Sequence, residues 1–328
     1  MTTLFDSTVS RRRLLTGATA LGVAGIAGLP TVTLAKAPLA KTQAPYWYRS
    51  KLGALEITIV SDGPLPLGPP GGSFLGVEPA SVDKMLTDNF LRTDNVVLEQ
   101  NVLVVNSGDR VILFDSGMGT SKLFGPTTGR LIASLKEAGI DPASIDAVVA
   151  SHAHIDHIGG LVGADGKPLF PNAEVHISQA DFDYWTDESN AKASKDFVVH
   201  ARKNLLPYRD RIKFFKDGQE FLPGVQAMAA PGHTVGHTVF LITSEGKSLC
   251  YIGDVTHHQV LLVEKPRIEF AYDTDPKQAV QTRVRILDML AKDKVQLLAY
   301  HFPWPGIGHV VVQGDGFRYL PTPMNMLL

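Results

Sequence analysis

The segment at residues 151–160 reads SHAHIDHIGG, and it constrains this chain more than any other stretch. It follows DAVVA, an apolar run typical of a buried strand, so its side chains are expected at a strand's carboxyl end. His152 and His154 are two residues apart and leave the same face of extended backbone. The chain then turns, so Asp156 and His157 can bind a second metal ion nearby. We therefore expect two adjacent half-sites for metal ions.

Later strands supply residues that can complete these half-sites. His233 follows the run VQAMA, Asp254 ends SLCYIGD, and His301 follows VQLLAY. Five histidines and two aspartates provide three or four ligands for each of two metal ions if one aspartate bridges them. Nitrogen and oxygen donors without a thiolate suit zinc, with manganese, iron or cobalt as alternatives.

The hydrophobic pattern predicts the arrangement that holds these residues. Apolar runs predict strands within residues 55–63, 101–108, 110–117, 146–152, 173–178, 225–232, 238–244, 248–254, 295–301 and 309–316. Helical periodicity covers residues 80–91, 127–138, 180–187, 195–208 and 276–292. Strand-rich halves, each followed by helices, predict an α/β protein with two packed sheets and helices outside, a four-layer αββα sandwich. The Pro- and Gly-rich segment 63–76 is expected to be an irregular surface loop that covers a site.

Composition excludes several classes of function. The formal net charge is -2, so no global basic field attracts nucleic acid. One cysteine, Cys250, allows no intrachain disulfide. Beyond residue 40 no apolar run is long enough to span a membrane.

The N-terminus predicts export. Residues 10–15 read SRRRLL and open a mildly apolar, Ala- and Gly-rich stretch, which is typical of a Tat signal peptide. The alternative is a basic surface cluster before an ordinary helix. Cleavage follows Ala35 or Ala37, although Pro38 argues against the second position. We divide the chain into a signal at 1–37 and a hydrolase domain at 38–328, with a periplasmic or secreted mature protein.

Several motifs together resemble one family. HAHIDH, GHTVGH, the GD pair and the late YH pair are similar to the metallo-β-lactamase superfamily, in its dinuclear hydrolase branch. The longer stretches KLFGPTTGRLIASLKEAG, FPNAEVHIS and HFPWPGIGH resemble methyl parathion hydrolases and related exported lactonases. The similarity runs from about Tyr46 to the C-terminus. It implies the metallo-β-lactamase form of the αββα sandwich, and family analogy implies a homodimer.

The resemblance also assigns ligands and a pocket. One metal is expected on His152, His154 and His233, the other on Asp156, His157 and His301, with Asp254 bridging both. Three aromatic residues match the leaving-group pocket of methyl parathion hydrolases, with ordinary core packing as the alternative. They are Phe124, Trp185 and Phe197.

This ligand set predicts hydrolysis. A water shared by two divalent ions loses its proton near neutral pH, and the resulting hydroxide attacks a carbonyl carbon or a phosphorus. Asp156 is expected to carry a proton to the leaving group, and His237 to orient ligands from behind. We expect cleavage of lactones or esters, with phosphotriesters as promiscuous substrates. The alternatives are a methyl parathion hydrolase-type phosphotriesterase as the main activity and a non-catalytic periplasmic metal-binding protein.

One position departs from both subfamilies. N-acyl-homoserine lactonases commonly have a tyrosine three residues after the bridging aspartate, and methyl parathion hydrolases have an apolar residue there. Here His257 occupies that position, within GDVTHHQ. A histidine can donate a hydrogen bond to a carbonyl or transfer a proton, so His257 is a candidate catalytic residue. A role behind the ligands or at the surface is the alternative, and the place of His258 is equally open. His176 and His200 are expected to be structural.

Overall fold

The computed structural model describes residues 37, 39, 43 and 46–328. Contacts divide the chain into two units, Met1–Thr42 and Gln43–Leu328, and the fold below is that of the second unit. The predicted export signal lies outside the described residues except for Ala37. No helix among the described residues is long and apolar enough to cross a membrane.

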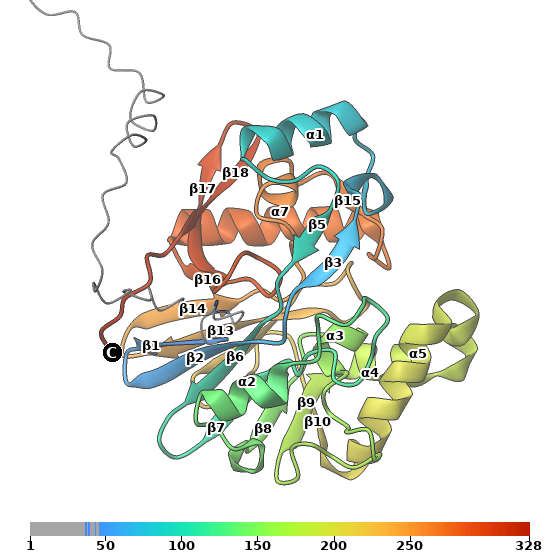
Figure 1. Cartoon of the computed structure of the whole chain (residues 1–328). Helices are drawn as coiled ribbons and strands as arrows, with labels where there is room; N and C mark the ends of the chain where they lie inside the picture. Colours follow the sequence, from blue (N-terminus) through green and yellow to red (C-terminus); the bar gives the residue numbers. More distant parts are fainter. Residues whose placement is uncertain (1–36, 38, 40–42, 44–45) are drawn as a thin grey trace, which may run out of the picture. The chain divides into compact units, whose positions relative to one another are not determined.

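Two seven-stranded sheets form the body of the protein (Figure 1). The first is antiparallel from β1 to β7 and parallel from β7 to β10, and the second is antiparallel except where β14 pairs with β16. In spatial order the first sheet contains β1 (Trp47–Leu52), β2 (Leu55–Ser61), β6 (Asn101–Asn106), β7 (Val111–Phe114), β8 (Ala147–Val149), β9 (Glu174–Ser178) and β10 (Ile212–Phe215). The second contains β11 (Glu220–Leu222), β12 (Val225–Ala229), β13 (Thr238–Ser244), β14 (Lys247–Tyr251), β16 (Gln296–Leu298), β17 (Ile307–Gln313) and β18 (Gly316–Pro321).

The two sheets pack face to face through large apolar side chains. Phe114 of β7 contacts Phe240 of β13 and Tyr251 of β14, each with ring centroids 5.5 Å apart. Neighbouring residues of these strands point the other way, because side chains alternate along a strand. Val239 and Cys250 therefore lie in a separate apolar cluster under a helix.

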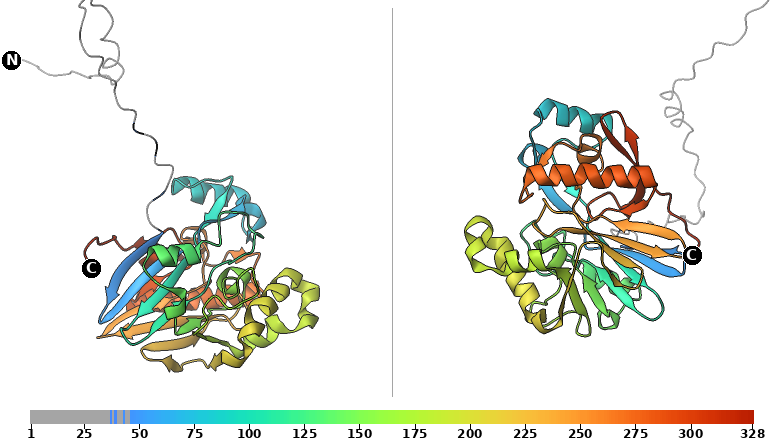
Figure 2. Two further views of the ribbon diagram at one scale, coloured as in Figure 1. Left: turned by 60° about the horizontal axis from the view of Figure 1, so that its bottom comes forward. Right: turned by 180° about the vertical axis from the view of Figure 1, so that it is seen from behind.

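Helices cover the outer faces (Figures 1 and 2). On the first sheet, α2 (Leu131–Glu137) contacts β1 and β2, and α4 (Gln179–Thr186) contacts β9. On the second, α7 (Pro276–Asp293) packs its apolar face, which includes Ile286, Leu287 and Leu290, into the cluster with Val239 and Cys250. The predicted four-layer αββα sandwich is confirmed.

A third apolar cluster lies beside the sandwich and alters one expectation. Segment 63–76 was expected to be irregular, but it contains β3 (Leu65–Gly68), a 3-10 turn at Pro70–Gly72 and β4 (Phe74–Leu75). β3 pairs with β5 (Val96–Leu98), and β4 pairs with β15 (Glu269–Phe270). The buried Leu65 and Phe74 pack with α1 (Pro79–Asp88) and α6 (Leu261–Glu264). These short strands escaped the pattern because prolines and glycines interrupt them.

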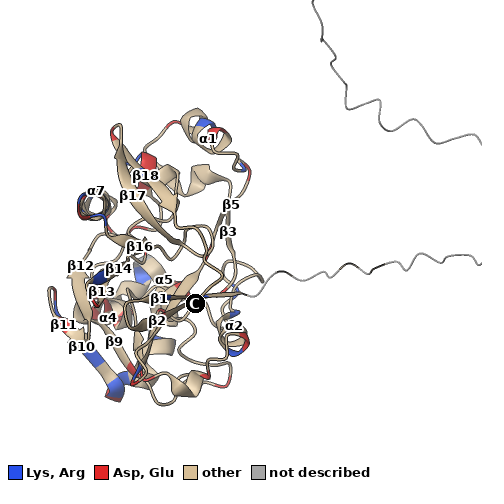
Figure 3. Cartoon of the chain, turned by 90° about the vertical axis from the view of Figure 1, so that its left-hand side faces the viewer, with Lys and Arg blue, Asp and Glu red and all other residues tan. Residues whose placement is uncertain are grey.

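The predicted helices are present with shifted ends. The region predicted as a helix over 195–208 is α5 (Ala191–Leu205) followed by a 3-10 turn at Leu206–Arg211. Another short helix, α3 (Ile155–Ile158), lies inside the histidine motif itself. The helices α1, α2 and α7 each carry both acidic and basic residues, and Figure 3 colours acidic positions red and basic positions blue on the ribbon.

Candidate metal centre

The predicted ligands come from loops that follow four strands. β8 ends at Val149, and His154, with extended φ -72° and ψ 155°, immediately precedes α3. The single turn of α3 then carries Asp156 and His157. His233, Asp254 and His301 follow β12, β14 and β16. Each of the seven residues has 8% of its surface exposed or less.

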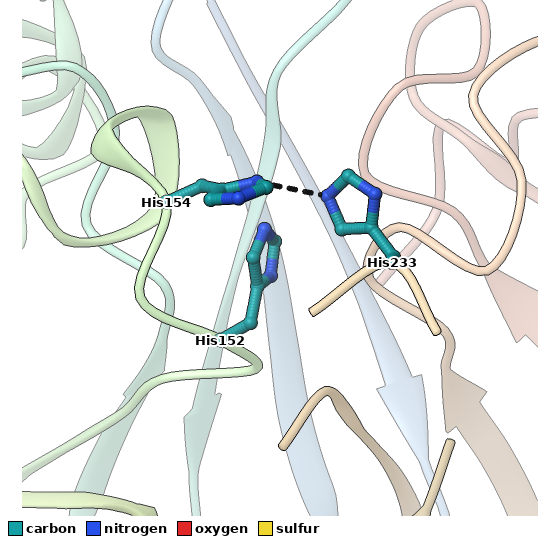
Figure 4. Close-up of side chains that lie close together, drawn as sticks. All are labelled: His152, His154 and His233. Atoms are coloured by element: carbon teal, nitrogen blue, oxygen red, sulfur yellow. Dashed lines mark hydrogen bonds between the residues drawn. The ribbon is translucent and has the colours of Figure 1, made fainter. Parts of the chain in front are cut away.

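Three histidines form the first cluster. Figure 4 shows His152 and His154 on one loop and His233 approaching from the opposite side. His154 Nδ1 lies 3.0 Å from His233 Nε2, and ligand atoms of all three residues lie within 4.8 Å of one another. Three imidazoles at this spacing suit a zinc-type ion.

The second cluster contains Asp156, His157, Asp254 and His301, again within 4.8 Å. His157 Nε2 is 3.4 Å from Asp156 Oδ2 and 3.2 Å from Asp254 Oδ1. Asp254 Oδ2 lies 3.3 Å from His301 Nε2 and 3.2 Å from His233 Nε2 of the first cluster. The Asp254 carboxylate therefore lies between the two clusters and would be within reach of a metal ion held by either one.

Unpartnered atoms show that these residues fit metal ions. His152 Nε2, His157 Nε2 and Asp254 Oδ1 are buried and make no hydrogen bond, because the last two atoms, although 3.2 Å apart, are not aligned for one. A buried polar atom without a partner costs about 1–3 kcal/mol, so such atoms are rare in folded proteins. All three belong to the two clusters, and coordination of a cation at each cluster would satisfy them.

In three of the histidine ligands, the second ring nitrogen, Nδ1, lies within hydrogen-bonding distance of an acceptor outside the ligand set. His157 Nδ1 lies 2.7 Å from Asp115 Oδ2, and His233 Nδ1 lies 2.8 Å from Asp273 Oδ1. His301 Nδ1 lies 2.8 Å from the carbonyl oxygen of Glu99. Each acceptor favours a proton on Nδ1 and leaves the Nε2 lone pair for a metal.

Asp115 is a functional residue that our sequence interpretation missed. It follows β7 with φ 63° and is fully buried. Its carboxylate accepts hydrogen bonds from Ser151 N–H, Ser151 Oγ and Tyr251 Oη in addition to contacting His157. The signal was present, because RVILFDSG ends a strand in an aspartate as SLCYIGD does.

Asp273 and Arg283 were missed as well. The Arg283 guanidinium, on α7, lies 3.4 Å from Asp273 Oδ2 and donates to the carbonyl oxygens of Val255, Pro266 and Ile268. Arg283 is 1% exposed. It therefore holds together the segment that carries the carboxylate behind His233, and no local sequence pattern marks such an arginine.

The histidines of the two clusters differ in the direction of their pKa shifts. Burial lowers the pKa of His152 and His154 well below its usual range. Burial opposes protonation of His157 too, but the carboxylates of Asp254 and Asp156 raise its pKa well above the usual value. Burial would raise the pKa of Asp254, yet His157 and His301 hold it well below the usual range. His157 and His301 also lower the pKa of Asp156 against the effect of burial, so both carboxylates are available as anions.

A narrow pocket opens onto these ligands. Five of the seven predicted ligands share its wall with His257 and seven apolar or aromatic side chains. The apolar wall comprises Leu65, Leu67, Leu98, Phe124, Phe197, Phe270 and Tyr272.

The aromatic predictions have different outcomes. Phe124 and Phe197 line the pocket, and Phe197 also lies 4.7 Å from the His154 ring. Trp185 does not line it, which corrects our expectation. Its side chain is 2% exposed and packs edge-on against His154 at 5.0 Å, within the main apolar core. Trp185 thus supports a ligand instead of contacting the pocket.

The histidines outside the ligand set have distinct places. His257 lines the pocket, stacks on Phe270 with centroids 4.0 Å apart, and holds Nε2 3.0 Å from Asp254 Oδ2. His258 accepts hydrogen bonds from the backbone of Val260 and Leu261, so it caps the start of α6. His237 Nε2 accepts from Asp254 N–H, which matches its expected orienting role. His176 and His200 lie on β9 and α5, away from the pocket wall.

The fold and the paired clusters define a protein built to hold two metal ions at the floor of a partly apolar pocket. The family model of the "Metallo-beta-lactamase superfamily" matches residues 96–301, well over half of the chain. The chain belongs to this superfamily, which classes it with metallo-hydrolases, and the resemblance stated from its motifs is confirmed at this level.

Two solved structures and one protein sequence show the similarity in more detail. The structure of AidC, described as a dizinc quorum-quenching lactonase in complex with a product, is 32% identical with a TM-score of 0.80, covering 84% of this chain and 97% of that one. The hydrolase AbOPH is 30% identical with a TM-score of 0.80, covering 87% and 100%. The N-acyl homoserine lactonase AiiA of Bacillus thuringiensis subsp. kurstaki is 24% identical over 58% of this chain. This chain spans 66% of that protein's length.

The first cluster leads to a direct prediction. His154→Ala removes one of three nitrogens, so the bound metal should fall from about two ions per chain to about one. Elemental analysis of the purified protein measures this, with far-UV circular dichroism to show that the variant is folded. His200→Ala, on α5 and outside both clusters, is the control and should retain both ions. A full complement of two ions in His154→Ala would contradict the assignment.

Proposed function

We propose that this chain is a dinuclear metal-dependent hydrolase of lactones or esters, with phosphotriester hydrolysis as a secondary activity. The observation that carries the proposal is the shared wall of the pocket. Asp254, which lies between the two ligand clusters, and the aromatic residues Phe124 and Phe270 face the same space. A substrate with an apolar portion therefore binds with its reactive carbonyl beside the metal ligands. The similarity to a dizinc lactonase supports this choice of substrate class.

The ligand set supplies the means of hydrolysis. When bound, two divalent ions lower the pKa of coordinated water and polarise the oxygen of the electrophile. We expect zinc, with manganese, iron or cobalt as alternatives. The residues of the chain fix the positions of the ions, keep the site largely shielded from bulk water and align the substrate against the pocket wall.

Asp156 is proposed to move the proton. Its Oδ2 lies 3.3 Å from His301 Nε2 and 3.4 Å from His157 Nε2, and its carboxylate also lines the pocket. The Tyr300 hydroxyl donates to the Asp156 carbonyl oxygen at 2.6 Å and fixes this turn. Oδ2 thus lies with the histidines of the second cluster, and the carboxylate would take up the proton that the attacking water releases and pass it to the leaving oxygen of the opened ester.

His257 is proposed as a second catalytic residue. Its Nε2 faces the Asp254 carboxylate, and its Nδ1 is buried without a hydrogen-bond partner. Because the carboxylate can only accept, Nε2 is the protonated nitrogen and Nδ1 presents a lone pair. A free lone pair on Nδ1 supports proton transfer, one of the two roles expected from the sequence, over the other, donation of a hydrogen bond to a carbonyl.

A matched set of substrates tests the proposed activity. Zinc- or manganese-loaded mature protein should hydrolyse dihydrocoumarin or an acyl-homoserine lactone faster than methyl paraoxon, with kcat/KM measured under one condition. A dominant rate on methyl paraoxon would replace the proposal with the phosphotriesterase alternative. No turnover of any substrate by protein with two bound metals would leave the non-catalytic metal-binding protein.

A variant tests the role of His257. His257→Phe keeps the ring stacked on Phe270 but removes both nitrogens, so kcat on the preferred lactone should fall about 10²-fold. Bound metal should stay near two ions per chain. His200→Phe, on α5 and outside the pocket wall, is the control and should leave kcat unchanged. Full activity in His257→Phe would remove this residue from the catalytic set.

We also propose that the chain is exported and that it forms a homodimer. The SRRRLL motif supports Tat export to the periplasm or beyond, and the family resemblance supports a homodimer. Replacing Arg12 and Arg13 by lysine should keep the chain in the cytoplasm at its uncleaved mass. An uncleaved chain in the wild-type periplasmic fraction would contradict the signal-peptide boundary. Light scattering on the purified mature protein measures the oligomeric state.

A further inference from the structure

Two buried aspartates outside the ligand set each accept three hydrogen bonds. Both Asp62 and Asp181 have no exposed surface. Burial raises the pKa of each to about 6, and the hydrogen bonds oppose that shift. Every partner of the two side chains donates, so all four carboxyl oxygens are used as acceptors, as in a carboxylate. A buried carboxylate with three donors fixes the groups that donate to it, because losing any of these bonds leaves charge unsatisfied.

Asp62 holds both ends of one loop. Its Oδ2 accepts from the backbone N–H of Met118 at 2.9 Å and of Gly129 at 3.0 Å, and its Oδ1 accepts from Leu131 N–H at 2.8 Å. Between these anchor points, residues 119–128 carry Phe124 to the pocket wall. Gly117 enters the loop with φ 70°, and a Cβ there would lie 2.4 Å from Asp62 Cγ. The carboxylate and the base of the loop are thus in close contact.

Asp181 joins the two loops of the first metal cluster. Its Oδ2 accepts from Ala153 N–H at 2.8 Å and from Thr234 Oγ1 at 3.0 Å, and its Oδ1 accepts from Gly236 N–H at 2.6 Å. Ala153 lies between the ligands His152 and His154, and Thr234 directly follows the ligand His233. A shift of this carboxylate would separate the histidines that must converge on one ion.

We infer that Asp62 and Asp181 are positioning residues with separate tasks: Asp62 sets the Phe124 wall of the substrate pocket, and Asp181 sets the distance between the two loops of the first metal cluster. The substrate part of this inference rests on the proposed function. The structural part does not, because loop anchoring and metal affinity can each be measured without turnover.

Asp62→Asn and Asp181→Asn form a matched pair. Each keeps the shape of the side chain but replaces one acceptor oxygen by an amide group that cannot accept from N–H. Loss of one charge-assisted hydrogen bond corresponds to roughly a tenfold change in the equilibrium it supports.

Asp62→Asn should loosen its loop. Trypsin cleavage after Lys122, which lies in the loop beside Phe124, should become about tenfold faster, as followed by mass spectrometry of the fragments. Zinc affinity, measured by competition with a chromogenic chelator, should be unchanged. On the preferred lactone KM should rise while kcat is retained.

Asp181→Asn should give the opposite pattern. Zinc affinity should fall about 10–100-fold, in the range seen when partners behind metal ligands are removed. Cleavage after Lys122 should keep the wild-type rate. The inference is overturned if both variants change the same readout, or if Asp62→Asn weakens zinc and leaves Lys122 protected. Absence of lactone turnover in the wild type would remove the proposed function and leave these two readouts decisive.

If either variant fails to fold, amide hydrogen exchange on the wild-type protein tests the positioning roles of Asp62 and Asp181 directly. Met118, Gly129 and Leu131 should exchange slowly, as should Ala153 and Gly236, whereas Leu123 in the middle of the loop should exchange fast. Fast exchange at the amides that donate to either carboxylate would overturn the role assigned to it.

Discussion

The burial of the Asp254 carboxylate among imidazoles is the constraint on which the rest of this structure depends. Its oxygens lie within 3.3 Å of nitrogens of His157, His233 and His301, which come from three different loops. A buried charge is costly unless it is paired, and cations at the two clusters would provide the pairing. One strand of the first sheet, β8, and three of the second, β12, β14 and β16, end beside the site, and the loops after them carry the ligands. Asp115, Asp273 and the Glu99 carbonyl then fix which nitrogen of each ring faces the centre.

The pocket adds selectivity to this centre. Its apolar wall comes from the region beside the sandwich, from the loop that carries Phe124 and from the segment that carries Phe270. These segments are held by Asp62 and by Arg283, which are buried and lie outside the ligand set. The metal loops have their own buried carboxylate in Asp181. Asp62 and Asp181 thus support different parts of the site, whereas Arg283 contacts both the segment before Phe270 and Asp273, the carboxylate behind His233.

Sequence patterns predicted the two packed sheets, the covering helices and the residues that the structure brings together at strand ends, but they missed the strands β1, β10, β11 and β18. This worked because a ligand after a continuous apolar run is a local signal: His233, Asp254 and His301 each follow such a run. The buried residues that hold the loops in place were not predicted, because the groups they bind are far away in the sequence. Examples are the contacts of Asp62 with Leu131 and of Arg283 with Pro266. Trp185 was misplaced because an aromatic residue beside a ligand looks the same in sequence whether it faces the pocket or the core. Short strands such as β3 were hidden by their prolines.

Anomalous X-ray diffraction from crystals of the zinc-loaded protein, recorded at the zinc absorption edge, tests the central claim most directly. Two peaks are predicted about 3.5–4 Å apart, one among His152, His154 and His233 and one among Asp156, His157 and His301, with Asp254 between them. A single peak, or peaks away from Asp254, would contradict the account.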